Sequence, residues 1–410
     1  MDREPDGGQA PSGRGRDRGA AADPGPAGAA GRDEGAPHLY VHLPFCRSRC
    51  AYCDFPAEPI GPHLRAGRVT AFVEALRAEL DLRGALLALP LETVYLGGGT
   101  PTVLPPGVLL PLVAELGGLL APGGEFTIEA NPGTLDLPLL RGLRAAGVTR
   151  LSLGVQSFAP GLLRALGRRV SVEEIESALA AIRGAEWEDW NLDLVFGIPG
   201  QDWQTARADL DRAVSSGAPH VSVYDLSYPP SYAKRVRPEV REAAWVFSEA
   251  HYADAMSALA AEGYERYEVS AFARPGHRSR HNLAYWRGHD YVGVGPAAVS
   301  TIGLSRWTNP VEVGSYLAGE EPTVETLTPA IRLYEEAMLG LRTADGISER
   351  RLASVLDSRE VDRLVAQGLL QRACGILSVT LRGFDLCTAI LARLLREPGP
   401  LPPSSTAGTP

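Results

Sequence analysis

Short apolar runs alternate with longer amphipathic segments through the first half of the chain. Runs rich in β-branched and aromatic residues, typical of strands, lie at 39–43, 93–97, 125–130, 150–156, 190–197 and 220–227. Segments with helical periodicity lie between and after them, at 68–83, 107–120, 136–146, 172–184 and 203–216. Such alternation is typical of right-handed βαβ units around a parallel sheet. We therefore predict an α/β fold, a partial (β/α)6 barrel, whose chemistry gathers at the carboxyl ends of the strands.

The pattern changes in the second half of the chain. A long helical stretch is predicted from 236 to 262, followed by a strand-like run at 264–272. Residues 276–310 are rich in glycine, asparagine and aromatic residues, which predicts a loop region that covers the mouth of the barrel. From about 328, short helical segments and one β-type run indicate a small helical, winged-helix-like domain. The pattern leaves open whether this domain does more than pack against the barrel.

Both ends of the chain contain almost no large apolar side chains. Residues 1–36 and 397–410 consist mainly of glycine, alanine, proline and polar residues, so we expect a disordered extension and a disordered tail. Between them we place the domain boundaries as follows: a barrel at 37–235, a barrel extension with the loop region at 236–325, and a C-terminal helical domain at 326–396.

Composition excludes several classes of protein. The net charge of the 410 residues is -9, which argues against general electrostatic binding to nucleic acid. Lys234 is the only lysine and stands outside any Gly-Lys-Ser/Thr sequence, so phosphate-loop ATPases and GTPases are excluded. The chain contains neither the long apolar run of a membrane-spanning helix nor the apolar core of a secretion signal. We expect a cytoplasmic protein without an integral membrane segment.

Three of the five cysteines stand close together. Cys46, Cys50 and Cys53 form a C-x3-C-x2-C loop directly after the first predicted strand. Thiolates at this spacing can bind one soft metal centre, and three of them leave one iron of a four-iron cluster open for another ligand. Two alternatives are a zinc site completed by His42 and three reduced thiols without a metal. Zinc motifs usually pair two C-x2-C elements and a second one is missing here, which favours the cluster.

Several further segments carry a family resemblance. The cysteine loop, with Tyr52 before its last cysteine, resembles that of the radical S-adenosylmethionine superfamily. A glycine-rich segment, GGGTPT at 97–102, follows the second strand. Four later segments each contain one polar residue of interest: Glu129 in IEANP, Gln156 in GVQSF, Arg168 in LGRR and Asp193 in NLDLVFGIPGQ. Together, from about 38 to 390, these motifs resemble the oxygen-independent coproporphyrinogen III oxidases and their HemW-type haem-chaperone relatives.

The resemblance implies a [4Fe-4S] cluster on the three cysteines, with S-adenosylmethionine bound to its open iron. Glycine backbone can approach the methionine amino group closely, Glu129 and Asp193 can accept from ammonium and ribose hydroxyl groups, and Arg168 can pair with the carboxylate. Taken alone, each such residue is more often structural. The positions that match the family's cofactor contacts are Tyr40, Gly98, Gly99, Thr100, Glu129, Gln156, Arg168, Asp193, Ser227 and Val299.

Two features favour the chaperone branch of this family. The cysteine loop of the oxidases follows the pattern C-x3-C-x2-C-x-C, whereas this chain has Phe55 at the position of the additional cysteine. The HN-x2-YW sequence at 281–286 is typical of the HemW-type proteins. Its histidine, His281, is a candidate axial haem ligand, and Tyr285 and Trp286 offer flat faces to a porphyrin. The alternative is a loop histidine capped by Asn282, with the aromatic side chains packing under the loop.

Two functions from different classes follow from the resemblance. The first is a chaperone that binds haem and hands it to a respiratory or other acceptor haem protein. The second is an oxidase that decarboxylates two propionates of coproporphyrinogen III by radical chemistry and forms protoporphyrinogen IX. Phe55 and the HN-x2-YW sequence favour the first.

Overall fold

A nine-stranded sheet organises the computed structural model, which describes residues 35–60, 66–226 and 249–396. Its order is β11-β1-β4-β5-β6-β7-β8-β10-β9. Six consecutive neighbours are parallel and form the predicted partial barrel: β1 (His38–Leu43), β4 (Leu91–Gly98), β5 (Leu120–Ala130), β6 (Arg150–Gln156), β7 (Trp190–Phe196) and β8 (His220–Asp225). At the edges, β11 (Val292–Val294) adds a parallel strand, while β10 (Ala271–Ala273) and β9 (Glu265–Arg266) run antiparallel. The predicted fold class is thereby confirmed.

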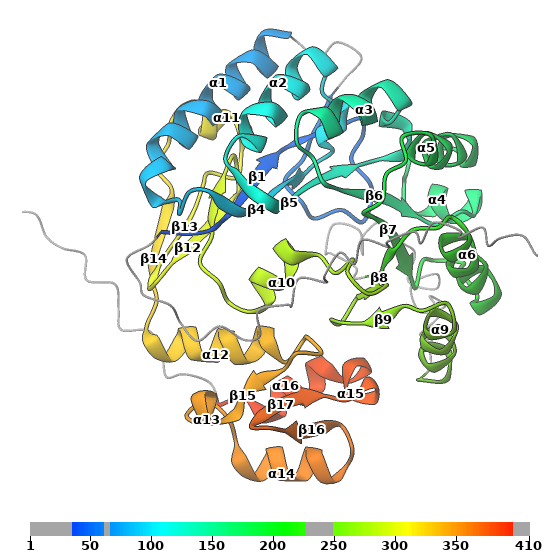
Figure 1. The fold of residues 1–410 in the computed structure, drawn as a ribbon, viewed down its shortest axis with the longest axis vertical. Helices are drawn as coiled ribbons and strands as arrows, with labels where there is room; N and C mark the ends of the chain where they lie inside the picture. Colours follow the sequence, from blue (N-terminus) through cyan, green and yellow to red (C-terminus); the bar gives the residue numbers. More distant parts are fainter. Residues whose placement is uncertain (1–34, 61–65, 227–248, 397–410) are drawn as a thin grey trace, which may run out of the picture. The chain divides into compact units, whose positions relative to one another are not determined.

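Helices connect the parallel strands and lie along the outer side of the sheet (Figure 1). Local signals define their starts: Asp136 and Asp202 accept backbone N–H bonds at two of them, and Ser171 and Glu174 form a capping box at a third. The five predicted helices are found close to their predicted bounds, and a short one is added; they are α1 (Ala66–Arg83), α2 (Pro106–Gly117), α3 (Leu137–Ala145), α4 (Pro160–Ala165), α5 (Val172–Gly184) and α6 (Trp203–Ser215).

Alternate residues of the barrel strands face opposite sides. Apolar side chains such as Leu39, Val94 and Leu153 are fully buried in the core between sheet and helices. Polar side chains occupy the other face, where they bond across strands; for example, the Asn191 amide donates to Ser152 Oγ at 2.8 Å.

The prediction that 276–310 is a loop region over the barrel mouth is wrong. The segment forms α10 (Arg280–Trp286), β11, β12 (Val299–Ile302) and β13 (Ser305–Thr308). Helix α10 lies at the amino ends of the barrel strands, because its residues bond to Thr93 near the start of β4 and to Glu125 on β5. The glycines and asparagine that suggested a loop occupy the turns around these short elements.

The second half of the predicted helix at 236–262 is α9 (Glu249–Ala261); its first half lies outside the described residues. The strand-like run at 264–272 divides into β9 and the start of β10. Beyond them, β14 (Thr323–Thr326) joins β12 and β13 in a three-stranded sheet, and α11 (Val313–Leu317) packs near α1.

The C-terminal segment has a hydrophobic core of its own, around Leu341, Leu364 and Leu377. A buried ion pair, Arg266–Asp385 at 2.7 Å, connects it to β9. Its elements are a three-stranded sheet and helices: α12 (Pro329–Gly340), β15 (Ile347–Ser348), α13 (Glu349–Leu352), α14 (Ser358–Ala366), β16 (Leu370–Ala373), β17 (Ile376–Val379), α15 (Leu381–Asp385) and α16 (Cys387–Leu394).

Nearly all residues of the two ends, for which we expect disorder, lie outside the described part of the chain. Ala36 is described, and it is ordered: it is buried and its N–H donates to the Leu86 carbonyl at 2.8 Å. The domain boundaries stay predictions. Over the described part of the chain, no helix combines the length and the apolar character needed to cross a membrane.

Candidate functional site

The cysteine loop leaves β1 at the carboxyl end of the barrel. Strand β2 (Phe45–Cys46) pairs with β3 (Glu58–Pro59), and the chain between them contains Cys50 and Cys53. All three cysteines are half-buried and free. Cys46 Sγ lies 3.6 Å from Thr100 Oγ1, and burial raises the pKa of the Cys46 thiol to about 11. Three soft donors therefore stand on one loop at the end of the barrel where chemistry is expected.

The donor set fits an iron–sulfur cluster in its chemistry, and the three sulfur atoms act on one another electrostatically. Within 35–60, 66–226 and 249–396, however, no group of three cysteine, histidine or acidic side chains lies close enough together to hold a metal ion. His42, the candidate fourth zinc ligand, has its ring nitrogens 3.1 Å from Tyr40 Oη and 3.0 Å from the Pro56 carbonyl oxygen.

The glycine-rich segment after β4 packs tightly under this loop. The N–H of Gly99 donates to the Leu43 carbonyl at 2.8 Å, and that of Thr100 donates to the Phe45 carbonyl at 2.7 Å. A Cβ atom on Gly99 would lie 2.5 Å from the Phe45 carbonyl oxygen, and one on Gly98 would lie 2.5 Å from the His42 ring. The glycines are therefore required by contacts within the protein, whatever ligand binds beside them.

Glu129, near the end of β5, is held through both carboxylate oxygens. Tyr95 Oη donates to Oε1 at 2.7 Å, and the Gly98 N–H donates to Oε2 at 3.0 Å. Burial raises the pKa of Glu129 to about 7; the Tyr95 bond acts against this, and Asp193 acts with it. Near neutral pH this carboxyl group therefore changes between its charged and neutral forms.

Asp193 on β7 is the second carboxylate inside the barrel. It accepts from the Asn191 amide at 2.6 Å and from Ser152 Oγ at 3.3 Å. Burial raises its pKa, while these hydrogen bonds and the charge of Arg168 oppose the rise. The two predicted acidic residues thus share the inner face of the barrel and influence each other's charge.

Arg168 connects the cysteine loop to the strand ends. Its Nη2 donates to Asn131 Oδ1 at 2.7 Å and to the Gly154 carbonyl, and its Nη1 lies 4.0 Å from Cys50 Sγ. The buried Nε has no hydrogen-bond partner among the described residues. The amide of Asn131 donates to Thr100 Oγ1 at 2.6 Å. Cys50, Thr100, Asn131 and Arg168 line one small hollow.

Sequence reasoning overlooked Asn131, although it stands two residues after Glu129 in the quoted IEANP segment. It also overlooked Tyr95, which stands two residues before the glycine-rich run. The only signal for each was its position beside a motif at a strand end.

The remaining predicted cofactor positions are more scattered. Tyr40 lies on the inner face of β1, where its ring packs against Tyr95 with centroids 6.0 Å apart. Gln156 ends β6 with a φ of 73°, a left-handed conformation that is uncommon for a residue other than glycine. Val299 starts β12, in a separate sheet, with its backbone close to Gly293 of β11. Ser227 lies outside the described residues.

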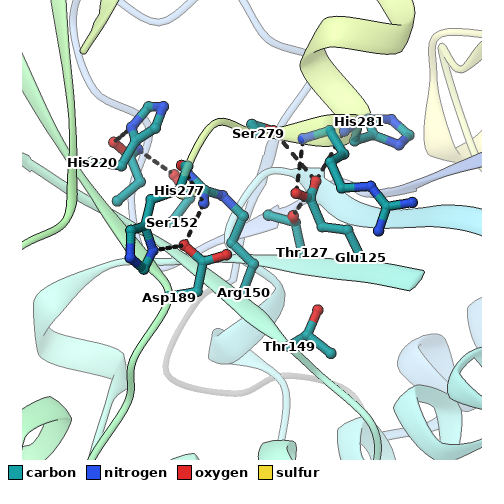
Figure 2. Close-up of polar contacts among 12 residues, drawn as sticks. Glu125, Thr127, Thr149, Arg150, Ser152, Asp189, His220, His277, Ser279 and His281 are labelled. Carbon is teal, nitrogen blue, oxygen red and sulfur yellow. Dashed lines mark hydrogen bonds and ion pairs between the residues drawn. The ribbon is translucent and has the colours of Figure 1, made fainter. Parts of the chain in front are cut away.

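His281 is buried at the opposite, amino end of the barrel. Its ring is 1% exposed, its Nδ1 lies 2.6 Å from Thr93 Oγ1, and its Nε2 has no partner among the described residues. Tyr95 and Tyr285 contact it, each with ring centroids 5.0 Å away. Burial lowers the pKa of His281 well below its usual range, so the ring is neutral. Figure 2 shows it on α10, beside Ser279.

Comparison with known proteins agrees with this architecture. A parallel (β/α)6 barrel with three cysteines after its first strand is the arrangement of a radical S-adenosylmethionine domain, and the family model "Radical SAM superfamily" matches residues 40–213. Curated relatives cover more of the chain. The haem chaperone HemW of Synechocystis sp. is 37% identical over 342 residues, 77% of this chain and 80% of the relative. HemW of Mycobacterium tuberculosis is 37% identical over 374 residues, 87% of this chain and 94% of the relative. This chain belongs to the HemW haem-chaperone family.

A solved structure extends the similarity in fold. Coproporphyrinogen III oxidase (HemN) from Escherichia coli matches 88% of this chain and 90% of its own with a TM-score of 0.73. The identity of 23% is low, so this similarity concerns the fold alone.

Proposed function

We propose that this protein binds haem and transfers it to an acceptor haem protein, respiratory or other, and that it carries a [4Fe-4S] cluster and S-adenosylmethionine. The observation that carries the proposal is the 37% identity to curated haem chaperones over most of both chains. The alternative, oxygen-independent coproporphyrinogen III oxidase, shares the fold. Phe55, 63% exposed beside the cysteine loop, stands where the oxidase pattern has a further cysteine and favours the chaperone.

Cys46, Cys50 and Cys53 would hold the cluster through their thiolates. When bound, the cluster would supply an open iron and one-electron chemistry. The start of the loop that carries the cysteines is held by the backbone N–H groups of Gly99 and Thr100, which donate to the Leu43 and Phe45 carbonyl oxygens.

S-adenosylmethionine would bind between this loop and the strand ends. Arg168 has an unsatisfied Nε that can donate to a carboxylate, and Glu129 and Asp193 can accept from ammonium and hydroxyl groups. The N–H groups of Gly98 and Gly99 already donate to Glu129 and to the Leu43 carbonyl oxygen, and an ammonium group needs an acceptor, which the Glu129 carboxylate offers. The remaining contacts follow from the family resemblance and are Tyr40, Thr100, Gln156, Ser227 and Val299.

His281 is the proposed haem ligand, and its hydrogen bonding suits that role. The single hydroxyl of Thr93 lies 2.6 Å from His281 Nδ1 and 3.0 Å from His38 Nδ1; it can accept from either ring and donate to at most one of them. If the Nδ1–H of His281 is the donor, its unpartnered Nε2 carries a lone pair, the form that binds iron. Because the ring is 1% exposed, α10 has to move before haem can reach it.

The proposal is tested with the full chain reconstituted anaerobically. Titration with ferric haem is followed by absorbance, and the loaded protein is then mixed with apomyoglobin as an acceptor. We expect saturable haem binding that is lost in His281→Ala and kept in His277→Ala, a partly exposed histidine of the same segment. Equal haem affinity and spectra in both variants would remove His281 as the ligand.

A second assay separates chaperone from oxidase. Protein with confirmed cluster content receives coproporphyrinogen III, S-adenosylmethionine and a strong reductant. We expect no protoporphyrinogen IX, and its formation would establish the oxidase instead. Cys46→Ala, Cys50→Ala and Cys53→Ala should each abolish the iron–sulfur absorbance, whereas Cys374→Ala, at an exposed cysteine elsewhere, should retain it. A full cluster in any of the three loop variants would contradict the ligand assignment.

A further inference from the structure

We infer that Tyr95 is a positioning residue of the proposed S-adenosylmethionine site, which orients Glu129 through its hydroxyl group, and that the ring of His281 supports Tyr95 from below. This inference rests on the proposed function, because it concerns the binding of the same cofactor. Helix α10 carries the HN-x2-YW sequence and lies at the amino end of the barrel. By this inference, it supports cofactor binding at the opposite, carboxyl end.

Tyr95 reaches Glu129 across the gap between two neighbouring strands. Its Oη donates to Oε1 of the carboxylate at 2.7 Å, while the Gly98 N–H fixes Oε2. Gly97 provides the space for this contact, since a Cβ atom there would lie 2.7 Å from Tyr95 Cε1 and 2.8 Å from Glu129 Cδ. The carboxylate is therefore held in one orientation by one side chain and one backbone group.

His281 lies against the Tyr95 ring with its centroid 5.0 Å away and the ring planes at 31°. On its other side the ring of Tyr285 makes an edge contact at 5.0 Å. The Nδ1 of His281 bonds to Thr93, two residues before Tyr95 on the same face of β4. The histidine is thus fixed to the strand whose tyrosine it supports.

Helix α10 is itself anchored, so it can serve as a support. The Glu125 carboxylate accepts from the N–H groups of Arg280 at 2.8 Å and His281 at 2.9 Å (Figure 2). Glu125 lies on β5, four residues before Glu129 on the same inner face. One pair of strands, β4 and β5, therefore carries both the anchor of α10 and the carboxylate that α10 helps to position.

The Tyr95 hydroxyl also influences the charge of Glu129. Its hydrogen bond counteracts the burial that raises the pKa of Glu129. The other ionisable groups that interact with this carboxyl are Asp193 on β7, Tyr40 on β1, Tyr224 on β8 and Cys46 in the loop. The charged form of Glu129 is the one that accepts from an ammonium group, so binding rises with pH through the pKa of Glu129. Removal of the hydroxyl raises that pKa and moves the rise to higher pH.

Tyr95→Phe tests the first part. We would measure S-adenosylmethionine binding by equilibrium dialysis on reconstituted protein with matched iron content, across neutral pH. We expect roughly tenfold weaker binding at pH 7, the usual effect of removing a hydrogen bond to a charged group, and a rise displaced to higher pH. Tyr316→Phe is the matched control, because Tyr316 also donates to a carboxylate, Glu79 at 2.9 Å, away from this site. Unchanged affinity and pH profile in Tyr95→Phe would overturn the inference.

His281→Phe and His281→Ala test the second part. Phenylalanine keeps a ring under Tyr95 and removes both ring nitrogens, whereas alanine removes the ring. We expect S-adenosylmethionine affinity close to that of the unaltered protein for His281→Phe and several-fold weaker for His281→Ala. Equal affinities for the two variants, whether both retained or both reduced, would overturn the supporting role of the ring.

The same measurements separate this inference from the proposed function. Failure of the unaltered, cluster-loaded protein to bind S-adenosylmethionine at all would refute the cofactor proposal. Binding by that protein with no effect of Tyr95→Phe would refute only the inference. Haem titration of His281→Phe reports independently on haem ligation, because that variant keeps the ring and lacks the nitrogen.

Discussion

Replacement of Glu125 should release α10 from the barrel. Glu125 is 5% exposed and accepts from the N–H groups of Arg280 and His281, the first two residues of the helix. N–H groups in the first turn of a helix have no partner within the helix, so Glu125→Ala leaves the buried N–H of His281 unsatisfied and removes the partner of the N–H of the exposed Arg280. At about 1–3 kcal/mol for a buried donor without a partner, the docked position of α10 loses about 1–3 kcal/mol through the N–H of His281.

A second effect acts in the same direction. The Glu125 carboxylate also favours the charged form of the fully buried Arg150, whose Nη1 donates to Asp189 at 2.6 Å and to the His277 carbonyl oxygen at 3.0 Å. Without Glu125, this guanidinium group keeps its neighbour Asp189 and loses one compensating charge. Glu125→Gln retains one acceptor oxygen and should have about half the effect of Glu125→Ala.

Native-state hydrogen exchange with mass spectrometry measures this loss directly. The expected change corresponds to a decrease in protection of about fivefold or more for the amide at 281. Glu115→Ala serves as the control, since Glu115 is half exposed and pairs with Arg77 on the surface, where such a pair contributes about 1 kcal/mol or less. If the His281 amide were as well protected from exchange in Glu125→Ala as in Glu115→Ala, the proposed anchoring of α10 by Glu125 would be refuted.

Two further predictions concern the cofactors. Gly99→Ala places a methyl group against the Phe45 carbonyl oxygen and should reduce the iron that the protein retains after anaerobic reconstitution. Gly107→Ala is the control, because no atom lies within 4 Å of the added Cβ, and it should retain the iron. Equal iron content in the two variants would show that the loop adapts to the methyl group. If haem binds to His281, and S-adenosylmethionine binding needs the same ring against Tyr95, then each ligand should lower the protein's affinity for the other by the same factor. Haem titrations with and without S-adenosylmethionine, and the reciprocal dialysis, check this, and independent affinities would contradict it.

The barrel could be predicted from the sequence because its signals are local. Each parallel strand is a short apolar run, and several helices start at their own capping residues, such as Ser171 and Asp202. The edge strand β11 could not be predicted in this way. Its three residues pair with β1 at Leu39, Tyr40 and Val41, about 250 residues earlier in the chain, and nothing in the run 292–294 indicates that partner.

The site could be predicted in part for a related reason. Motif positions identified Glu129 and Thr100 near strand ends and Arg168 after a helix. Thr100 and Arg168 lie beside cysteines of the loop, and Glu129 interacts electrostatically with Cys46. The residues that hold them in place depend on pairing between strands. Tyr95 and Asn131 act through bonds to residues 34 and 37 positions away, and these distances become short only after the sheet has formed.

The position of α10 changes what a variant of the HN-x2-YW sequence can reveal. His281, Tyr95 and Glu129 form a continuous series of contacts from the amino end of the barrel towards the cysteine loop, along the inner faces of β4 and β5. A substitution at His281 therefore removes the proposed haem ligand and, unless a ring replaces it, the support of a proposed cofactor carboxylate as well. His281→Ala is therefore expected to change the affinities for haem and for S-adenosylmethionine at once. Retention of S-adenosylmethionine together with loss of haem in His281→Phe would attribute the loss to the missing ring nitrogen.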